Sequence, residues 1–401
     1  MGNDPREAVV LSAARLPAWR FQGSLSSFPA PKLGALAIQA AVQRAGLPEP
    51  GAIDEVIMGN VVSAGLGQAP ARQAALLAGL PDRVGATTIN KVCGSGLKAV
   101  MLAAQAIRAG DGDLYVSGGF ESMSRAPFLV DARTGSLRFG HAQLTDALLL
   151  DGLWDPFENW GMGDSAEFIA NKYSITRQEM DEFALASHQK ALAASDAGKF
   201  KAEIVPVEIR GSKGQITIFN TDETPRRDTS LEALAKLKPA FQEGGKVTAG
   251  NSPGLNDSAA AVVVASHAKA DEYGLRPLAR LVGYAQAALA PKYLFDAPSL
   301  AIPKLLEKVG WKLPEVDLLE INEAFAAQAL ANGRSLADQG WDWQKVNVNG
   351  GAIALGHPIG ASGARLLTTL IYALKDRHLQ RGLVSLCLGG AEAVAMAIEI
   401  E

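Results

Sequence analysis

Short apolar runs alternate along the 401-residue chain with longer stretches in which apolar residues recur every three or four positions. The short runs are typical of buried strands, and the longer stretches are typical of amphipathic helices. Strands are predicted at residues 8–13, 55–60, 113–119, 260–266, 278–285, 318–325, 345–351, 383–390 and 393–400. Helices are predicted at 31–46, 176–200 and 299–311. Strands that alternate with helices indicate an α/β protein whose sheet is buried between helices.

The stretch from residue 126 to residue 250 breaks this alternation. It is richer in proline, tryptophan and charged residues, and strands are sparse within it. We interpret it as an insertion between two α/β halves, in the place of a lid or a substrate-binding region.

A weak internal repeat relates the two halves. The sequence "LYVSGG" before residue 120 resembles "LVSLCLGG" near the C-terminus, and "CGSGLKAV" (93–100) overlies "CLGGAEAV" (387–394) without a gap. Glycine and alanine are common in this chain, so chance similarity is one explanation. A duplicated α/β unit is the other, and it predicts that Cys93 and Cys387 occupy related positions.

Composition and charge argue against several classes of function. Apolar residues make up 48% and charged residues 20%, which is typical of a soluble globular chain of two or three domains. The net charge of -4 gives no support to nucleic-acid binding. No apolar run reaches the ~18 residues that cross a bilayer, and no signal-peptide core follows the N-terminus. Two cysteines make no disulfide framework, so we expect a reducing, cytoplasmic compartment. The five histidines are scattered, and no metal site is expected.

Cys93 lies in "NKVCGSGLKAV", after a short apolar run and before a helical pattern. This places the thiol at a strand-to-helix turn, where free backbone N–H groups and the helix dipole favour a thiolate. The same N–H groups are suited to a developing oxyanion, and the glycines allow a substrate to approach closely. Cys93 is therefore a candidate nucleophile, and a buried structural thiol is the alternative that this stretch leaves open.

His357 lies in "NVNGGAIALGHPIGASGAR", residues 347–365, which contains five glycines. Pro358 disfavours helical geometry at the preceding residue, so His357 is predicted on a loop that leads into a helix. A histidine in this setting is a candidate base or oxyanion donor.

Two further polar side chains follow predicted strands. Asn322, in "INEAFAAQAL", is either a helix N-cap or a catalytic amide, and the two roles do not conflict. Cys387, in "SLCLGGAEAVAM", is a candidate general acid or base, and a redox disulfide with Cys93 is the rival interpretation.

Six segments, taken together, resemble the thiolase family over essentially the whole chain. They are "NKVCGSGLKAV", "ESMSRAPF", "TAGNSPGLNDSAA", "INEAFAAQ", "NVNGGAIALGHPIGASGAR" and "CLGG", in the order that the family has them. The likeness is closest to the acetyl-CoA acetyltransferase branch. It implies the family's duplicated α-β-α-β-α layered fold, made of two pseudo-symmetric mixed-sheet halves with an inserted loop domain. The halves would be residues 1–125 with 255–275, and 276–401, and the loop domain 126–254.

The resemblance also implies a mechanism for reversible Claisen condensation through an acyl-cysteine. Cys93 would carry the acyl group, His357 would accept its proton, and Cys387 would exchange a proton with the acetyl-CoA methyl group. Asn322 would hold a water that, with His357, polarises the thioester carbonyl. The N–H groups of Cys93 and Gly389 would form a second oxyanion hole. Coenzyme A is the carrier, and no bound cofactor or metal is implied.

The loop domain of the family binds coenzyme A. Matching positions near the adenine, along the pantetheine channel or at the substrate are Arg226, Phe241, Gly250, Phe325, Met162 and Leu153. Without the resemblance, the two phenylalanines would be ordinary core residues and the arginine a solvated charge. Ala233 stands where relatives often have a serine, so one polar contact to the nucleotide is expected to be absent.

Four departures from the family pattern bear on the substrate. Gly161 replaces a histidine, Pro253 replaces a serine, Phe295 lies in "LFDAP" where the family has an "MGTGP"-like stretch, and Glu392 follows Cys387 in "GGAEA". They suggest an acyl preference that differs from strict acetoacetyl-CoA, toward longer 3-ketoacyl chains as in a thiolase of fatty-acid β-oxidation. Glu392 is expected either to pair with a base or face solvent, or to raise the pKa of Cys387.

Other functions remain in view at this point. A ketoacyl synthase also uses a cysteine on a duplicated fold, but it lacks a second cysteine in a "CxGG" setting. An inactive acyl-CoA binder is motivated by the departures. The family is dimeric or tetrameric, and residues 126–145 would hold the tetramer-forming loop.

Overall fold

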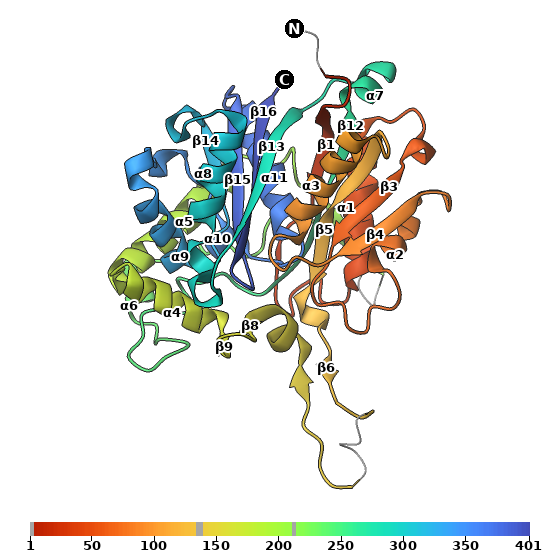
Figure 1. Ribbon diagram of the computed structural model, residues 1–401. Helices are drawn as coiled ribbons and strands as arrows, with labels where there is room; N and C mark the ends of the chain where they lie inside the picture. The colour runs from red at the N-terminus through yellow and green to blue at the C-terminus, as the bar shows by residue number, and fades with distance from the viewer. Residues whose placement is uncertain (1–3, 134–138, 211–213) are drawn as a thin grey trace.

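The computed structural model describes residues 4–133, 139–210 and 214–401. Two α/β halves share one 10-stranded sheet, with strand order β14-β15-β16-β13-β1-β12-β5-β3-β4 and β2 paired to β12. Within the sheet, the two halves are joined where β1 and β13 pair, at Val9 with Arg280 and Val10 with Ala279. Each half therefore keeps a sheet of its own around this narrow seam, as Figure 1 shows.

The first half contributes six strands to the sheet, with β4 at its edge. Its strands are β1 (Ala8–Arg15), β2 (Trp19–Arg20), β3 (Glu55–Gly59), β4 (Gly85–Ile89), β5 (Leu114–Ser122) and β12 (Asn256–Ser266). Its helices are α1 (Ala30–Ala45), α2 (Pro70–Leu77), α3 (Ser95–Ala109) and α7 (His267–Glu272). β3 runs parallel to β4 and β5, and β12 runs antiparallel to β5 and β1.

The second half repeats this arrangement. Its strands are β13 (Ala279–Ala288), β14 (Leu318–Ile321), β15 (Arg381–Leu388) and β16 (Glu392–Ile400). Its helices are α8 (Pro298–Val309), α9 (Ala326–Ser335), α10 (Ala352–Leu355) and α11 (Ser362–Asp376). β14 runs parallel to β15, and β16 runs antiparallel to β15 and β13. The same pairing order in both halves confirms the predicted duplicated fold.

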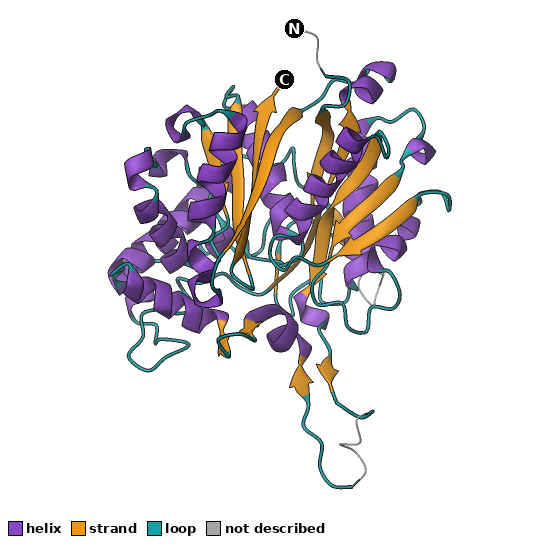
Figure 2. Cartoon of the chain, in the orientation of Figure 1, coloured by secondary structure: helices purple, strands orange, loops and turns teal. Residues whose placement is uncertain are grey.

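Five layers follow from the apolar faces of these elements. α3 and α11 lie between the two parts of the sheet, α1 and α2 cover the outer face of the first, and α8 covers the outer face of the second (Figure 2). Each interface is a continuous apolar cluster, and the central one buries the side chains of α3 and α11. The strands β1 and β12 are buried along their whole length, and burial on both faces explains their continuous apolar runs.

The middle of the chain adds no strand to the main sheet. Its strands are β6 (Phe128–Leu129), β7 (Thr145–Asp146), β8 (Trp154–Asp155), β9 (Trp160–Gly161), β10 (Val207–Arg210) and β11 (Ile216–Phe219), paired in twos. Its helices are α4 (Met162–Lys172), α5 (Arg177–Asp196) and α6 (Leu231–Ala235), and the π-helical turn Leu149–Leu153 precedes β8. The β6–β7 hairpin projects from the body (Figure 1).

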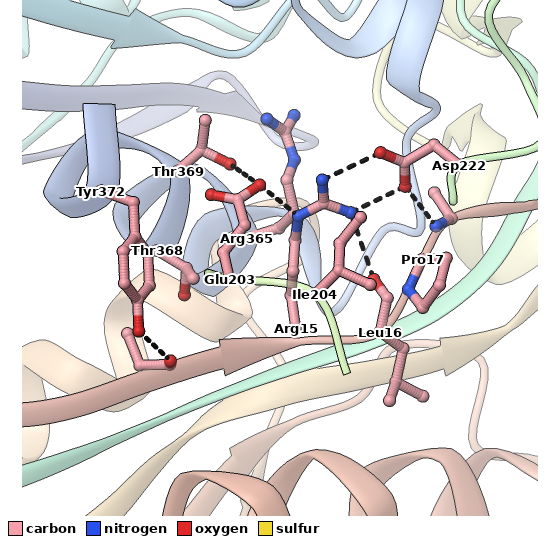
Figure 3. A network of polar contacts seen from close by, with 12 residues as sticks. Arg15, Leu16, Pro17, Glu203, Ile204, Asp222, Arg365, Thr368, Thr369 and Tyr372 are labelled. Atoms are coloured by element: carbon pink, nitrogen blue, oxygen red, sulfur yellow. Dashed lines mark hydrogen bonds and ion pairs between the residues drawn. The ribbon is translucent and has the colours of Figure 1, made fainter. Parts of the chain in front are cut away.

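A buried polar network fastens this middle region to the central layer (Figure 3). The guanidinium of Arg15, at the end of β1, donates to Glu203 at 2.6 Å and to both oxygens of Asp222 at 2.7 and 2.8 Å. The hydroxyl of Thr369, on α11, donates to Glu203 at 3.3 Å. Arg15 is only 1% exposed, so loss of one partner would leave a buried charge at a cost of about 3–5 kcal/mol.

Three predictions about elements need correction. Residues 345–351 form turns rather than a strand, and only Val346 bridges to Leu319, because Asn347 and Gly350 take positive φ. β14 ends at Ile321, before the predicted end at residue 325. β4 was not predicted, since its short "GATTI" sequence is half exposed at the edge of the sheet.

The gapless overlay of the two cysteine segments is also wrong. Cys93 precedes a helix, whereas Cys387 lies within β15, and residues 387–394 form the turn of a hairpin. The likeness of "LYVSGG" to "LVSLCLGG" does follow the duplication, because it matches β5 with β15.

Candidate functional site

Cys93 lies in a strained turn between β4 and α3. Val92 has φ 44°, a left-handed conformation that a β-branched residue rarely adopts. The Ser95 hydroxyl holds the turn, because it accepts the Lys91 N–H at 2.8 Å and donates to the Val92 carbonyl at 2.7 Å. The Asn90 side chain accepts the Val92 N–H at 2.9 Å. The half-buried thiol is thus fixed at the N-terminus of α3, as predicted.

Glycines let the two central helices cross almost backbone to backbone. A Cβ on Gly96 of α3 would lie 2.9 Å from the Ala364 nitrogen, and a Cβ on Gly363 of α11 would lie 2.4 Å from the Leu97 nitrogen. Side chains of any size would separate the helices. The close crossing therefore brings the turn before α3 next to the loop before α11.

His357 lies on that loop, and its tautomer follows from its partners. The Ser362 hydroxyl has a single proton and donates it to the Pro358 carbonyl at 2.9 Å. The His357 Nδ1 atom, 2.7 Å from the same hydroxyl, must then be the donor. This leaves Nε2 unprotonated and ready to accept a proton. Burial, and then the charge of Arg365, lower the pKa of His357 to about 4, so the ring is a neutral base.

Two buried carboxylates and one amide hold the loop that carries His357. Glu323 accepts from the side chains of Ser187 and Asn347 and from the Ile353 N–H at the start of the loop. Asn256 accepts the His357 N–H at 2.9 Å. The other end of the loop is held by the carboxylate of Glu121, which accepts four hydrogen bonds of 2.9 to 3.2 Å. The donors are Asn60 Nδ2, Val61 N, Val62 N and Gly360 N.

Glu121 and Asn256 were missed from the sequence, although both lie within segments that carried the family resemblance. Glu121 is fully buried beside Cys93, and burial raises its pKa to about 7 despite its four hydrogen bonds. Nothing in its local pattern distinguishes it from an exposed glutamate, because its donors come from distant segments.

Asn322 is free for chemistry. The helix after it begins at Ala326 with Phe325 in the N-cap position, so the N-cap role is wrong. The side chain is completely buried, its Nδ2 lies 3.5 Å from His357 Nε2, and its Oδ1 has no partner. A buried polar atom without a partner next to an unprotonated imidazole is suited to a water or a substrate oxygen.

Cys387 and Gly389 meet Cys93 from the opposite half. Cys387 is the last residue but one of β15, and burial, followed by the nearness of Cys93, raises its pKa well above the usual range. The Gly389 backbone N–H lies close enough to the Cys93 sulfur to lower the pKa of that thiol. Both cysteines are free thiols in this structure. The redox disulfide therefore stays a prediction.

The state of Cys93 differs from the predicted one. Burial raises the pKa of its thiol to about 12, and the N–H groups of Gly389 and Cys93 offset only part of that effect. The helix N-terminus does not produce a resting thiolate. The His357 imidazole is neutral as well, and a thiol acting with such a base gives up its proton as it attacks. With N–H groups beside the sulfur, the arrangement is suited to acyl transfer.

A cavity of about 240 Å³ opens beside the site, lined mainly by the middle region, with Arg20 and Asn256 from the first half and Ile353 from the second. It is lined by Arg226, Gly250, Ala233, His188 and Ile353, among others. Its inner end includes Asn256, the residue that holds the His357 backbone. His188 was missed from the sequence. Its Nδ1 accepts the Arg226 N–H at 3.2 Å and so fixes the loop that carries the arginine.

Three aromatic rings form a wall next to Cys387. Phe325 lies edge-on to Phe241 at 6.1 Å and to Phe295 at 5.6 Å, measured between ring centroids. Phe295 and Phe325 share one buried cluster with Cys387, and Met162 packs against it. Leu153 packs against another cluster, which Cys93 also borders. All the predicted residues of the channel therefore lie around the two cysteines or the cavity.

The four departures take distinct places. Phe295 fills space in the aromatic wall, and a Cβ on Gly161 would contact only Asp164, at 3.4 Å. Pro253 lies between two residues that line the cavity, Ser252 and Gly254. Glu392 forms an ion pair with Lys91, which confirms the expectation that it pairs with a base.

Among residues 4–133, 139–210 and 214–401, no cluster of three or more histidine, cysteine or acidic side chains is arranged to hold a metal ion. In the same described part of the chain, no helix is both long and apolar enough to cross a membrane.

Comparisons with known proteins cover nearly the whole chain. The family models described as "Thiolase, N-terminal domain" and "Thiolase, C-terminal domain" match residues 8–268 and 275–400. An acetyl-CoA acetyltransferase of Pseudomonas aeruginosa is 53% identical over 394 residues, which are 98% of this chain and 99% of the relative. Acetyl-CoA acetyltransferase 2 of Arabidopsis thaliana is 50% identical over 99% of this chain and 98% of its own. The crystal structure of the Bacillus anthracis acetyl-CoA acetyltransferase superposes with a TM-score of 0.95 at 44% identity, covering 98% of this chain and 99% of the other.

Proposed function

The chain belongs to the thiolase family and is an acyltransferase, and we propose that it is an acetyl-CoA C-acetyltransferase with Cys93 as its nucleophile. The assignment is supported by two neighbouring groups: Cys93 with Cys387 and the Gly389 N–H, and His357 with Asn322 on the loop that the α3–α11 crossing brings next to the turn of Cys93. The names of the full-length relatives, at about half identity, support the same activity.

In the cleavage direction, Cys93 attacks C3 of acetoacetyl-CoA and its proton passes to His357 Nε2. The C2–C3 bond breaks, and the enolate of acetyl-CoA takes the proton of Cys387. Coenzyme A then gives its thiol proton to the Cys387 thiolate and attacks the acetyl-Cys93 thioester. Cys93 leaves as a thiolate and recovers its proton from His357. Condensation of two acetyl-CoA molecules is the reverse sequence.

Each hydrogen-bond donor of the site has a role in these reaction steps. The N–H groups of Gly389 and Cys93 face the sulfur that bears the acyl group, so they would stabilise the oxyanion formed when the thioester is attacked. Asn322 and His357 would polarise the carbonyl of the enolate through a water held by the free amide. The high pKa of Cys387 suits a group that protonates an enolate, because the thiol remains protonated until the bond breaks.

Coenzyme A would enter through the cavity beside Arg226 and Gly250, with residues 126–254 as the loop domain that binds it. Arg226 would meet the adenine end, and Phe241, Phe325, Met162 and Leu153 would line the path of the pantetheine to the thiols. Ala233 offers no polar contact on the cavity wall. Coenzyme A and its thioesters are the substrates, and the proposal includes no resident cofactor.

The acyl group would be short. Phe295 is 2% exposed and closes the wall next to Cys387, which leaves little room for a chain beyond the reacting carbons. The open space beside Gly161 is the feature that favours the alternative, a 3-ketoacyl-CoA thiolase with longer substrates. Steady-state thiolysis of 3-ketoacyl-CoAs from C4 to C10 separates the two. A steep loss of kcat/KM beyond C4 supports the acetyltransferase, and a rise toward C8 or C10 contradicts it.

An inactive acyl-CoA binder is the alternative of another class. Wild-type protein mixed with acetoacetyl-CoA and quenched would carry an acetyl group on Cys93 by mass spectrometry, and Cys93→Ala would carry none. Absence of the acyl group in the wild type, with coenzyme A binding retained, would point to the binder.

A cytoplasmic homodimer or homotetramer is the proposed form of the enzyme. The outer edge of β4 is unpaired and half exposed, which suits pairing with a second copy. Phe128, Val130 and Leu144 are exposed on the projecting β6–β7 arm, which suits tetramer contacts, although residues 134–138 of that arm lie outside the described chain. Light scattering during size-exclusion chromatography measures the oligomer.

A further inference from the structure

The oxyanion N–H of Gly389 and the nucleophile belong to different halves of the molecule. Gly389 lies in the turn between β15 and β16, and Cys93 lies in the turn before α3. The β15–β16 turn contains two adjacent glycines and takes positive φ at Gly390 and Ala391. Such a turn is conformationally permissive, so other contacts must set its position against the thiol.

Within its own half, the turn is held by the Leu289 N–H, which donates to the Ala391 carbonyl at 3.0 Å. Two further contacts reach the turn from the other half, and both come from the residues just before Cys93. The ammonium of Lys91 forms an ion pair with the carboxylate of Glu392, and the two side chains are 21% and 37% exposed. The Val92 side chain lies beside Gly389, where an added Cβ would meet Val92 Cγ1 at 3.2 Å. Val92 can reach this place because its φ is 44°. Residues 91–93 thus touch residues 389–392 at three successive points.

From this geometry we infer that Lys91 and Glu392 are positioning residues for the oxyanion hole, which they clamp in place across the two halves. They do not touch the reacting atoms. The ion pair acts through the β15–β16 turn, since Glu392 begins β16 three residues after Gly389. Loss of either charge would let the turn move away from the Cys93 sulfur and weaken the hydrogen bond from Gly389.

Direct electrostatics is the competing explanation, and it predicts a different pattern. A positive Lys91 would favour the oxyanion and a negative Glu392 would disfavour it. Removing the two charges one at a time would then change the acylation rate in opposite directions. The clamp predicts that both removals slow acylation, because each one releases the same turn.

The test measures the single-turnover rate of Cys93 acylation by acetyl-CoA in the full-length protein. Lys91→Met and Glu392→Gln are each expected to acylate about fivefold more slowly, which is the upper range for a half-exposed ion pair. KM for acetyl-CoA and the melting temperature are expected to stay unchanged. The exchange variant, Lys91→Glu with Glu392→Lys, is expected to be faster than either single variant. Lys199→Met removes a comparably exposed ion pair, to Asp376, and serves as the matched control.

Opposite effects of the two single variants would overturn the inference, as would unchanged rates or failure of the exchange variant to recover. A fall in melting temperature without a change in rate would mark the pair as structural only. The inference rests on Cys93 as the acyl carrier. If the wild-type protein forms no acyl-enzyme, the proposed function fails. If the wild type is acylated and the Lys91 and Glu392 variants are acylated at the same rate, only the positioning role of the ion pair is contradicted.

Discussion

The two halves have the same strand order but differ in what lies beside one strand. That strand is β3 in the first half and β14 in the second. In the first half β3 is paired with a full edge strand, β4, which leads directly into the turn of Cys93. In the second half β14 has only a single bridge, to Val346, and a glycine-rich loop replaces the strand. Duplication therefore gives two similar frames, and the loss of one strand lets them carry different chemistry.

The difference divides the reaction between the halves. The strand-to-helix turn of the first half holds a nucleophile rigidly at a helix N-terminus. The long loop of the second half brings His357 next to Asn322, and β15 adds Cys387 and Gly389. We expect covalent chemistry to depend on the first half and proton transfer and oxyanion binding on the second. Variants in the two halves test this division.

Replacing the nucleophile has the largest expected effect. Cys93→Ala removes the only group placed to carry the acyl chain, so kcat is expected to fall by about 10⁴-fold or more. Binding of coenzyme A, measured by calorimetry, is expected to remain. Residual turnover within tenfold of the wild type would mean that Cys387 carries the acyl group, and the proposed division between halves would be wrong.

Replacing the second cysteine is expected to separate the two half-reactions. Cys387→Ala should still accept an acetyl group on Cys93 from acetyl-CoA, because Cys93 and His357 form the new thioester and coenzyme A can leave as a thiolate that takes its proton from water instead of from Cys387. Condensation should fall by about 10³-fold, since no group remains to take the proton from the methyl carbon. Exchange of labelled coenzyme A into acetyl-CoA reports the first step, and acetoacetyl-CoA formation reports the second. Equal loss in both assays would contradict separate roles.

Glu121 links the halves, and its replacement tests the loop rather than the chemistry. Glu121→Gln puts an amide NH₂ where a carboxylate oxygen accepts two N–H donors, leaving buried donors unpaired. We expect the free energy of unfolding to fall by about 2–4 kcal/mol. kcat should also fall by about tenfold, because Gly360 and the His357 loop shift. Glu55→Gln, at the partly buried start of β3, is the control. Denaturant titration and steady-state rates measure the two effects.

The smallest expected effect is that of pH on the acylation rate. A neutral thiol and a neutral imidazole predict an almost flat dependence. His357 has its pKa near 4, so it loses its ability to accept a proton only as the pH falls toward that value. Cys93 has its pKa near 12, so it stays a thiol until the pH rises close to that value. Acylation rates should vary by less than about threefold between about pH 6 and 9. Glu121, with its pKa near 7, also titrates in this range, so a steep rise with a midpoint near pH 7 would indicate a thiolate–imidazolium pair if it persisted in Glu121→Gln.

The sequence was sufficient for the repeated strands and the layered fold, and it correctly located Cys93 before a helix and His357 on a loop that leads into a helix. Apolar runs identify β1, β12 and β16 because these strands are buried on both faces. Segment 345–351 was wrongly predicted as a strand, because apolar and polar residues alternate in "KVNVNGG". Its conformation is set instead by hydrogen bonds of the buried Asn347 amide, one of them to the carboxylate of Glu323.

The parts of the site that could not be predicted depend on distant partners. The tautomer of His357 depends on how Ser362 uses its one proton, and the raised pKa of Cys93 depends on burial by both halves. The roles of Glu121 and His188 require knowing which backbone N–H groups face them. Such contacts are set by tertiary structure and leave no local pattern.

The glycine crossing of α3 and α11 has a consequence for interpreting natural variants. Alanine is the better helix former, by about 1 kcal/mol, so a scale based on local preference would score Gly96→Ala as beneficial. The added methyl carbon would instead meet the Gly360 carbonyl oxygen at 3.0 Å, next to the segment that carries the imidazole. A chemically mild change, remote from any substrate, would therefore belong among the harmful alleles of this enzyme.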